Sequence, residues 1–422
     1  MKKVLGNNAN WMLFLMVDRK STIFLKILVL LTLFSPYVKV AGRSVYLFDF
    51  FLIALVIFSF IFLSFSVRRN DFIYFLFAIS FSVLILFFQA VFWGEVPGIY
   101  LVRLFFYFSF YIFLKDFVAT ADKRSVIEFV SRCVAIVSLL GIFQVVDHYA
   151  FSGSLGIAKF TSVLYPYPGE LAIRSQELSN GLQLKVGSFF NATSSFDGHS
   201  ILLGDFLSIS LGFLLYYRKY FALGLTTLCL ILTMSRGAWA MGFLSLVVFS
   251  FTGFTRRNVK SSLILASIAV FIFISLISIE VVREYLLFRV NNTLYTFGII
   301  EDQVGRAEDP RTAMVWPRLI NTLSELGWGA YLIGAPISFS ADSGYLTILR
   351  DSGFLGLLII LSFPLYILAS KVDRKAMLRV LIVIAVGMIV HPVFQGIRTV
   401  LFSVIIFLVF SLPDSTKFNR LS

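Results

Sequence analysis

The chain has 422 residues, of which 59% are hydrophobic and only 14% are charged, and its formal net charge at pH 7 is +13. A water-soluble protein of this length buries its apolar residues in a core and still needs a charged surface. The composition therefore excludes an ordinary soluble domain and indicates a chain that presents most of its surface to lipid.

Apolar runs recur along the whole chain at lengths suited to membrane-spanning helices, which need roughly 20 mostly apolar residues. We predict helices over 22–38, 45–66, 72–93, 97–114, 126–149, 198–217, 219–234, 237–254, 261–282, 343–369, 376–391 and 394–412. The expected fold is therefore an all-α, polytopic integral membrane protein with about 12 transmembrane helices, in which 1–422 is a single membrane domain. No signal-peptide pattern with a cleavage site precedes the first run, so we expect the amino terminus to stay in place.

The distribution of Lys and Arg predicts the orientation, because cytoplasmic loops collect these residues. With the amino terminus inside and the runs alternating, the inside segments carry twenty basic residues and the short outside connections carry four. The inside residues are Lys2, Lys3, Arg19, Lys20, Arg68, Arg69, Lys115, Lys123, Arg124, Arg218, Lys219, Arg256, Arg257, Lys260, Lys371, Arg374, Lys375, Arg379, Lys417 and Arg420. The outside residues are Lys39, Arg43, Arg236 and Arg398. We therefore expect both termini to be cytoplasmic. The basic residues of the cytoplasmic segments then account for most of the net positive charge. The sequence shows no soluble basic face with interleaved aromatic residues, so it does not suggest a nucleic-acid partner.

Two long polar segments, 150–197 and 283–341, face outward in this topology and are predicted to be large periplasmic loops. Long ordered loops usually carry function. The second loop contains a helix signal near 317–326, with Pro317 suited to a first helical position and Gly327 suited to a stop. Its apolar residues recur at helical spacing, which indicates a short helix on the membrane surface or over a cavity.

Arginines near the outer face are the first candidate binding residues. Arg236 lies in the segment Ser-Arg-Gly-Ala-Trp, between two predicted spans on the outer side. It is either an ordinary interface arginine, whose head group reaches the lipid headgroups, or an anion clamp, because a guanidinium offers a planar fork of donors to phosphate oxygens. Arg311 and Arg318 in the second loop, and Arg174 in the first, are further candidates, although acidic neighbours such as Glu308 also suit a solvated loop.

A polar stretch opens the predicted span 343–369. Asp342 and Ser343 lie at its start, where Asp is also an ordinary helix cap. Arg350 and Asp351 follow about two turns later, and ionisable groups at that depth indicate a buried pair or a polar cavity.

Two histidines are candidates for a general base near neutral pH, although an interface position explains each of them as well. His199 begins one predicted span, and His391 ends another. Cys133 and Cys229 lie inside apolar runs and are expected to be small buried hydrophobic residues. The sequence contains no phosphate-binding loop, no HExxH, no GxSxG and no CxxC motif, and it suggests no metal site.

Three segments resemble the O-antigen ligase and polymerase superfamily of bacterial envelope proteins. They are the Ser-Arg-Gly-Ala-Trp segment at 235–239, the stretch 311–334, and 342–356. The last segment resembles the family pattern of His, then Asn, Ser or Gln, nine residues, Gly, two residues and Gly, with Ser343, Gly353 and Gly356 in place. Asp342 replaces the histidine that ligases carry, and this departure favours a polymerase.

The resemblance implies a metal-independent, inverting glycosyltransferase without cofactors in the bacterial inner membrane. Its substrate would be undecaprenyl pyrophosphate carrying an oligosaccharide repeat unit, and a chain-length regulator protein is a further candidate partner. Arg236 and Arg311 would stabilise the negative charge of the leaving pyrophosphate. Asp342 is the first candidate for the base and His199 the second. Additional candidate contacts to pyrophosphate or glycan are Arg318, Arg350, Arg398, Arg174 and Tyr345.

Other functions share this composition. A ligase would transfer the finished polymer to lipid A core, and a lipid flippase or transporter would place charges along a midplane cavity. Interior charges that suit a transporter are Lys26, Asp49, Arg103, Arg132, Asp205 and Glu280. An assembly factor without catalysis would tolerate the loss of Arg236 and Arg311.

Overall fold

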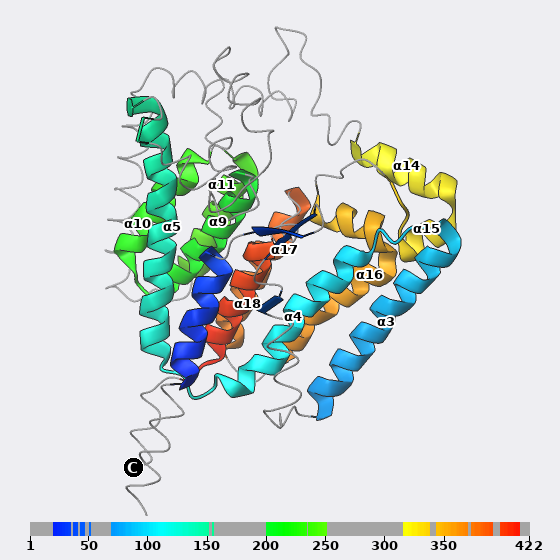
Figure 1. Ribbon diagram of the computed structural model, residues 1–422, viewed down its shortest axis with the longest axis horizontal. Coiled ribbons are helices and arrows are strands. Elements are labelled where there is room, and N and C mark those ends of the chain that lie inside the picture. Colours follow the sequence, from blue (N-terminus) through cyan, green and yellow to red (C-terminus); the bar gives the residue numbers. More distant parts are fainter. Residues whose placement is uncertain are drawn as a thin grey trace, which may run out of the picture.

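The computed structural model describes residues 20–34, 37–40, 43–46, 50–51, 69–151, 154–155, 200–233, 235–250, 315–337, 343–369, 373–390 and 397–413. Within these ranges the chain is predominantly helical (Figure 1). After a first helical segment at 20–34, the helices are α3 (Arg69–Trp93), α4 (Ile99–Phe117), α5 (Lys123–Phe151), α9 (Ser200–Tyr216), α10 (Tyr220–Leu232), α11 (Arg236–Ser250), α14 (Trp316–Leu326), α15 (Trp328–Ile333), α16 (Gly344–Ala369), α17 (Arg374–Val390) and α18 (Ile397–Ser411). The bounds of the helices from α3 to α11 and from α16 to α18 follow the apolar runs closely. The run 261–282 lies outside the described residues.

One short hairpin is the exception to the expected all-α fold. Strands β1 (Tyr37–Val40) and β2 (Arg43–Tyr46) pair antiparallel. The prediction that 22–38 is one helix is therefore wrong at its end, because the helical segment ends at residue 34. The strands contain Tyr and Val, which favour extended structure, and a proline at position 36 disfavours continuing the helix.

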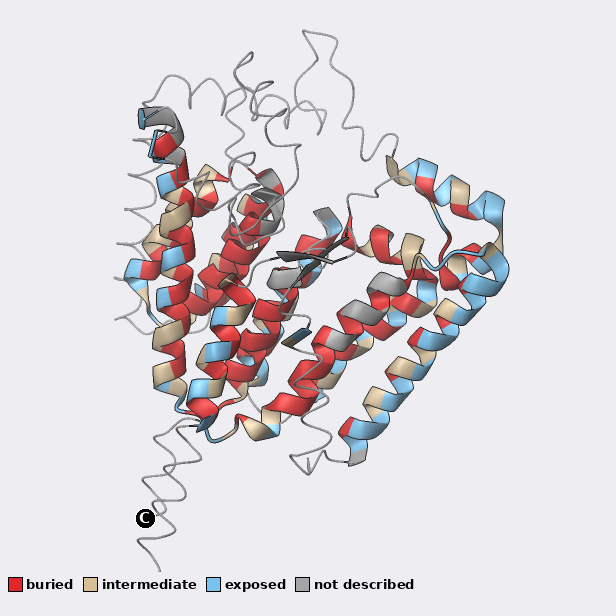
Figure 2. Cartoon of the chain, viewed as in Figure 1, coloured by how far each residue is buried: buried red, intermediate tan, exposed pale blue. Residues whose placement is uncertain are grey.

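Three helical stretches in the described part are long and apolar enough to cross a membrane, namely Asn70–Trp93, Lys123–Gln144 and Gly344–Ala369. Shorter apolar helices are Leu203–Tyr216, Tyr220–Leu232, Gly237–Ser250 and Thr399–Ser411. Figure 2 shows that much of α3 is exposed, including large apolar side chains such as Phe77, Val83 and Phe92. An exposed apolar face of this kind would favour aggregation in water, so it fits a surface that is covered by lipid.

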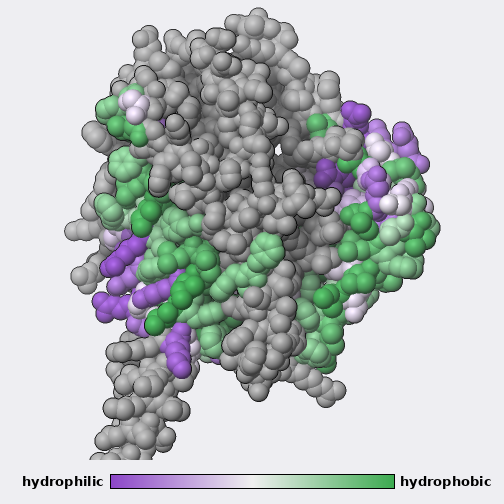
Figure 3. All heavy atoms as spheres, in the orientation of Figure 1, coloured by the Kyte–Doolittle hydropathy of each residue, from purple (hydrophilic) through white to green (hydrophobic). Residues whose placement is uncertain are grey.

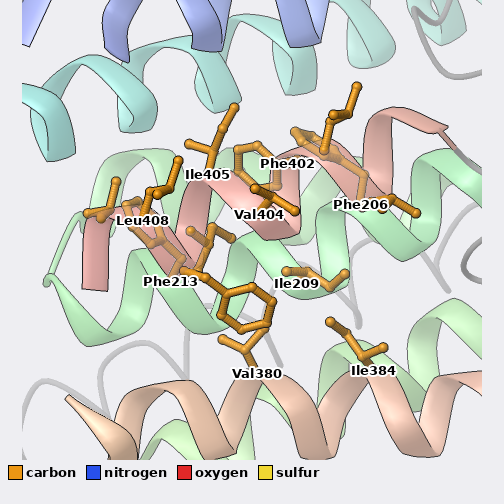
Figure 4. Close-up of a cluster of buried hydrophobic side chains, with 14 of the residues drawn as sticks. Phe206, Ile209, Phe213, Val380, Ile384, Phe402, Val404, Ile405 and Leu408 are labelled. Atoms are coloured by element: carbon orange, nitrogen blue, oxygen red, sulfur yellow. The ribbon is translucent and has the colours of Figure 1, made fainter. Parts of the chain in front are cut away.

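One cluster of the hydrophobic core lies where α9, α17 and α18 meet. Figure 4 shows Phe206 and Ile209 of α9 among residues of α17 and α18, including Ile384 and Phe402. The rings of Phe206 and Phe402 lie 4.6 Å apart between centroids. α11 packs against α9 and α17, while α10 packs against α5 and α9. Both cysteines are buried in these helices, as expected from the sequence.

Basic connections gather at one end of the bundle. Lys123 at the start of α5 donates a 3.0 Å hydrogen bond from Nζ to the backbone oxygen of Leu412, just after α18. Lys219, between α9 and α10, lies 3.9 Å from Glu128 near the start of α5. Three of the connections that were predicted to lie inside, those before α5, between α9 and α10 and after α18, are therefore neighbours in space.

The same end contains a buried polar cluster, which we call the inner cluster: Asp71, Lys115 and Tyr366. Lys115 Nζ lies 2.7 Å from Asp71 Oδ2. Tyr366 donates a 2.5 Å hydrogen bond to Asp71 Oδ1 and accepts one of 2.6 Å from Lys115. Nearby in the fold, Tyr216 at the end of α9 donates to Asp373, which precedes α17. The inner cluster ties α3, α4 and α16 together at this end.

Candidate functional site

The start of α11 carries the first family-like segment. Ser235 precedes the helix, and its Oγ accepts a 3.4 Å hydrogen bond from the Ala238 backbone N–H, as a helix cap does. Ser208 of α9 donates a 2.8 Å hydrogen bond to the Ala238 oxygen, and Gly204 leaves no room for a side chain beside Ala238. Arg236 is the first residue of α11, where the helix dipole adds positive character. This turn is therefore fixed closely against α9.

The start of α16 carries the second family-like segment. Ser343 Oγ donates a 3.2 Å hydrogen bond to the backbone oxygen of Met388, and the Tyr345 hydroxyl donates one of 2.9 Å to Ala385. Both acceptors lie near the end of α17. The Tyr345 hydroxyl therefore already has a partner in the protein, so a glycan would have to share it or displace it.

The two segments lie at the same end of the bundle, because α17 links them. Gly387, near the end of α17, lies against the Met241 side chain, which is five residues into α11. Ser343 contacts the next residue of α17, Met388. The starts of α9, α11 and α16 thus meet the end of α17. Since the basic connections lie where α9 ends and α17 begins, this end is the opposite one.

A buried carboxylate in this region is Asp205 of α9. It is fully buried, and among the described residues neither of its oxygens has a hydrogen-bond partner. Gly204 beside it contacts the start of α11, while Ile209, one turn along, lies beside Ile384 of α17 (Figure 4). Asp205 thus lies in the second turn of α9, on the helix face that continues through Ile209. A buried carboxylate without a partner is costly, so a functional reason is expected for it.

The sequence marks Asp205 only as one of several interior charges. Nothing in the apolar run 198–217 indicates that its neighbours leave the carboxylate without donors. This information is available only from the packing of α9 against α11 and α17. The run 198–217 does have small and polar residues spaced among large ones, and this composition indicates a tightly packed helix.

Arg350 and Asp351 form the pair expected from the sequence. Arg350 Nε and Nη2 donate hydrogen bonds of 2.6 Å and 3.0 Å to the two carboxylate oxygens of Asp351. Both side chains are largely buried, with 15% and 14% exposed. The guanidinium is thus held by its neighbour, and pyrophosphate would compete with Asp351 for its donors.

The two glycines of the family-like pattern explain the shape of α16. Gly353 has φ 65° and ψ −168°, which interrupts the helix. A side chain there would collide with the backbone of Leu332 in α15, and Gly356 is closely packed against Ser352. These glycines therefore allow a kink and a close approach of α15, and they do not themselves supply reactive groups.

The remaining candidate residues are distributed as follows. Asp342, His199, Arg311 and Arg174 lie outside the described residues, as does His391. Arg236 and Arg398 belong to α11 and α18, but their side chains are also outside the described part. Arg318 is exposed on α14, which Figure 1 shows on the opposite side of the view from α11. In the described structure the Ser235–Arg236 turn and Ser343 therefore lie at the same end of the bundle, and Arg318 does not lie near them.

No group of three or more His, Cys, Asp or Glu side chains that would suit a metal ion occurs among the described residues. Among the described residues, this end offers a helix start, hydroxyl groups and the carboxylate of Asp205. In comparisons with known proteins, the sequence matches no model of a protein family, and no curated protein is significantly similar to it.

Proposed function

We propose that the protein is an inverting glycosyltransferase that polymerises oligosaccharide repeat units carried on undecaprenyl pyrophosphate. In this proposal it crosses the bacterial inner membrane about twelve times, with both termini in the cytoplasm and the segments 150–197 and 283–341 in the periplasm. The reaction takes place at the outer end of the bundle. The product would be O-antigen or a related surface polysaccharide.

The observation that supports the proposal is the meeting of the two family-like segments at one end. The Ser235–Arg236 turn and Ser343 are linked through the end of α17. Basic connections that favour the cytoplasm lie at the opposite end. Two short segments more than 100 residues apart in the sequence thus share the face on which a lipid-linked sugar would be presented.

The chemistry follows from the bonds that change. An acceptor sugar hydroxyl attacks the anomeric carbon of the donor, the bond from that carbon to the pyrophosphate oxygen breaks, and the leaving group takes the bonding electrons. Arg236, at the positive end of α11, and Arg311 would stabilise the charge that develops on the pyrophosphate. Asp342 would accept the hydroxyl proton, with His199 as the second candidate.

A genetic experiment tests this function. The gene is deleted in its host, the surface polysaccharide is separated on a gel, and the strain is complemented with wild type, Arg236→Ala or Asp342→Ala. The matched control is Arg124→Ala, an exposed arginine at the opposite end of the bundle. We expect the deletion to leave single repeat units on the lipid core, with wild type and Arg124→Ala restoring the polymer and the two site variants failing.

Other outcomes would replace the proposal. A bare core with long polymer on the lipid carrier identifies a ligase. A bare core with repeat units trapped on the cytoplasmic side identifies a flippase. If both site variants restore full polymer, the chemistry does not depend on Arg236 and Asp342.

A transporter is the second candidate function, and Asp205 is the observation that favours it. Unpaired ionisable groups inside a helix bundle often mark the pathway of an ion or substrate. In a transporter, Asp205→Asn would abolish movement of the repeat unit across the membrane. In a polymerase, repeat units would still reach the outer face in this variant.

A further inference from the structure

Two buried polar clusters divide α3 into a central apolar part and two ends. The inner cluster lies at its beginning, around Asp71. At its other end, Gln89 is fully buried and donates hydrogen bonds from Nε2 to the backbone oxygens of Ile333 (2.5 Å) and Asp351 (2.8 Å). Its Oε1 accepts a 2.9 Å hydrogen bond from the Gly98 backbone N–H. We call Gln89 with these three backbone groups the outer cluster.

The distance between the clusters matches a bilayer. Asp71 and Gln89 are eighteen residues apart on α3, which corresponds to roughly 27 Å at about 1.5 Å per residue. The hydrocarbon core of a bilayer is about 30 Å thick. Between them, α3 exposes large apolar residues, among them Phe77, Val83 and Phe87. The two clusters therefore lie near the two edges of the hydrocarbon layer.

The outer cluster also fixes α15 at that depth. Gly334, which follows α15, has φ 80°, and a side chain there would lie 2.6 Å from the Arg350 oxygen. The Ala335 N–H donates a 2.8 Å hydrogen bond to the same oxygen. α14 is attached in turn, because its Leu319 and Leu323 are fully buried against Ala330 of α15 and its surroundings. The hairpin α14–α15 is thus packed against α3 and α16.

One surface of this hairpin is apolar and continues the exposed face of α3. Trp328 is 82% exposed and Leu332 is about half exposed, as is Phe354 of α16, whose ring stacks with that of Tyr331 in α15. Polar residues, including the exposed Glu325, belong to α14. Figure 3 shows hydrophobic residues over α3 and α15, with hydrophilic residues above them on α14. Trp and Tyr are enriched where apolar and aqueous layers meet, and Tyr331 lies beside Trp328.

We propose that the α14–α15 hairpin rests in the outer headgroup layer of the membrane, with Trp328 and Leu332 at the edge of the hydrocarbon and α14 toward water. The occupant of this apolar surface is lipid, since the surface is continuous with the exposed face of α3, a helix long enough to span the bilayer. The apolar residues of α14 do not all contact lipid, because Leu319 and Leu323 are buried within the protein.

The hairpin also sets the depth of α16. It contacts α16 at Gly353, so the nine residues from Gly344 to Ser352 lie outward of the hydrocarbon edge. The seventeen residues from Gly353 to Ala369 extend about 25 Å, close to the hydrocarbon thickness. Ser343 then lies outward of the hydrocarbon edge, on the side where a lipid-linked phosphate would be presented. This last consequence rests on the proposed function, whereas the depth of Trp328 does not.

Spin labelling of single introduced cysteines measures this depth. The native Cys133 and Cys229 are buried, so a nitroxide reagent attaches mainly to an introduced cysteine, and the labelled wild-type chain gives the background. Trp328→Cys is compared with Glu325→Cys on the polar side and with Phe77→Cys in the middle of α3. Each chain is reconstituted in vesicles of phosphatidylethanolamine and phosphatidylglycerol. Collisions are measured with oxygen, which concentrates in hydrocarbon, and with a water-soluble nickel complex.

The expected ratio of oxygen to nickel collisions is highest at position 77, intermediate at 328 and lowest at 325, with at least a several-fold difference between 328 and 325. Equal ratios at 328 and 325 would place the hairpin in water and overturn the proposal. Low collision rates with both reagents at 328 would mean that protein covers the surface, and this also overturns it. If Trp328→Cys does not fold, Leu332→Cys on the same surface provides the measurement. Because the readout is depth, it stays valid if the protein proves not to be a polymerase.

Discussion

Gln89 on α3 donates a hydrogen bond of 2.8 Å to the backbone oxygen of Asp351 on α16, across a separation of 262 residues in the chain. The same amide nitrogen also bonds the last residue of α15. One side chain thus connects three helices at the point where α16 is kinked. Its bonds to the Ile333 oxygen and from the Gly98 N–H are buried, and its bond to the Asp351 oxygen is partly buried.

Replacing Gln89 by Ala should destabilise the protein markedly. The change leaves the oxygens of Ile333 and Asp351 without this donor, and unsatisfied buried groups cost about 1–3 kcal/mol each. We expect a lower melting temperature in detergent. Unfolding is detected with a thiol-reactive dye, which labels the buried Cys133 and Cys229 when they become exposed. Gln144→Ala is the matched control, since Gln144 is also buried but its Oε1 has no hydrogen-bond partner within the described part of the chain. Equal losses in the two variants would contradict the role of Gln89.

Gly353→Ala should destabilise the protein by about 1–3 kcal/mol or more, because it combines a positive φ with a collision against the backbone of α15. Gly329→Ala, in α15 itself, is the control, as nothing lies within 4 Å of a side chain added there. Thermal unfolding of the two variants in the same detergent makes the comparison. A Gly353→Ala protein as stable as wild type would show that the kink is not required.

Substitutions of Lys115 and Asp71 in the inner cluster should have non-additive effects on the free energy of unfolding. Lys115→Met leaves Asp71 buried without its cation, which typically costs about 3–5 kcal/mol. Adding Asp71→Leu removes the stranded carboxylate, so the double variant should regain most of the lost stability. Arg124→Ala breaks only a surface pair with Glu128 and should change stability by less than about 1 kcal/mol. If the double variant is less stable than Lys115→Met alone, the cluster does not act as a coupled unit.

Asp205→Asn should preserve folding, and under the proposed polymerase function repeat units should still reach the outer face in this variant, whereas a transporter would no longer move them there. The substitution keeps the size of the side chain and removes a carboxylate that has no hydrogen-bond partner among the described residues. The measurement combines the unfolding temperature with the polysaccharide pattern of a complemented deletion strain. An unfolded variant would mean that the carboxylate supports the fold, and a folded variant with full polymer would exclude Asp205 from the function.

Much of the helical fold is predictable from apolar runs alone. The runs 343–369 and 198–217 match α16 (Gly344–Ala369) and α9 (Ser200–Tyr216) within two residues at each end, since the hydrophobic pattern ends where each helix ends. The paired strands Tyr37–Val40 and Arg43–Tyr46 were not predicted, because the end of the run 22–38 and the start of the run 45–66 continue the apolar pattern into each strand, and the polar residues between them indicate only a connection.

The site is less predictable, because partners distant in sequence leave no local signal. Arg350 and Asp351 are adjacent, so their pairing could be expected. A lone Gln89 inside an apolar run gives no indication of the two backbone oxygens that it bonds on other helices. The kink at Gly353 likewise depends on how close α15 approaches, which the glycine permits but does not specify.

The most direct measurement of the proposed activity uses the purified, reconstituted protein with undecaprenyl-pyrophosphate-linked repeat units as its sole substrate. The proposal predicts a ladder of lengthening glycans on the lipid carrier, with one undecaprenyl pyrophosphate released for each bond formed, and no ladder with Arg236→Ala. Arg124→Ala, folded to the same extent, should give the wild-type ladder. If the wild-type protein is folded and binds the repeat-unit lipid but neither lengthens the glycan nor releases its carrier, the protein is not a polymerase.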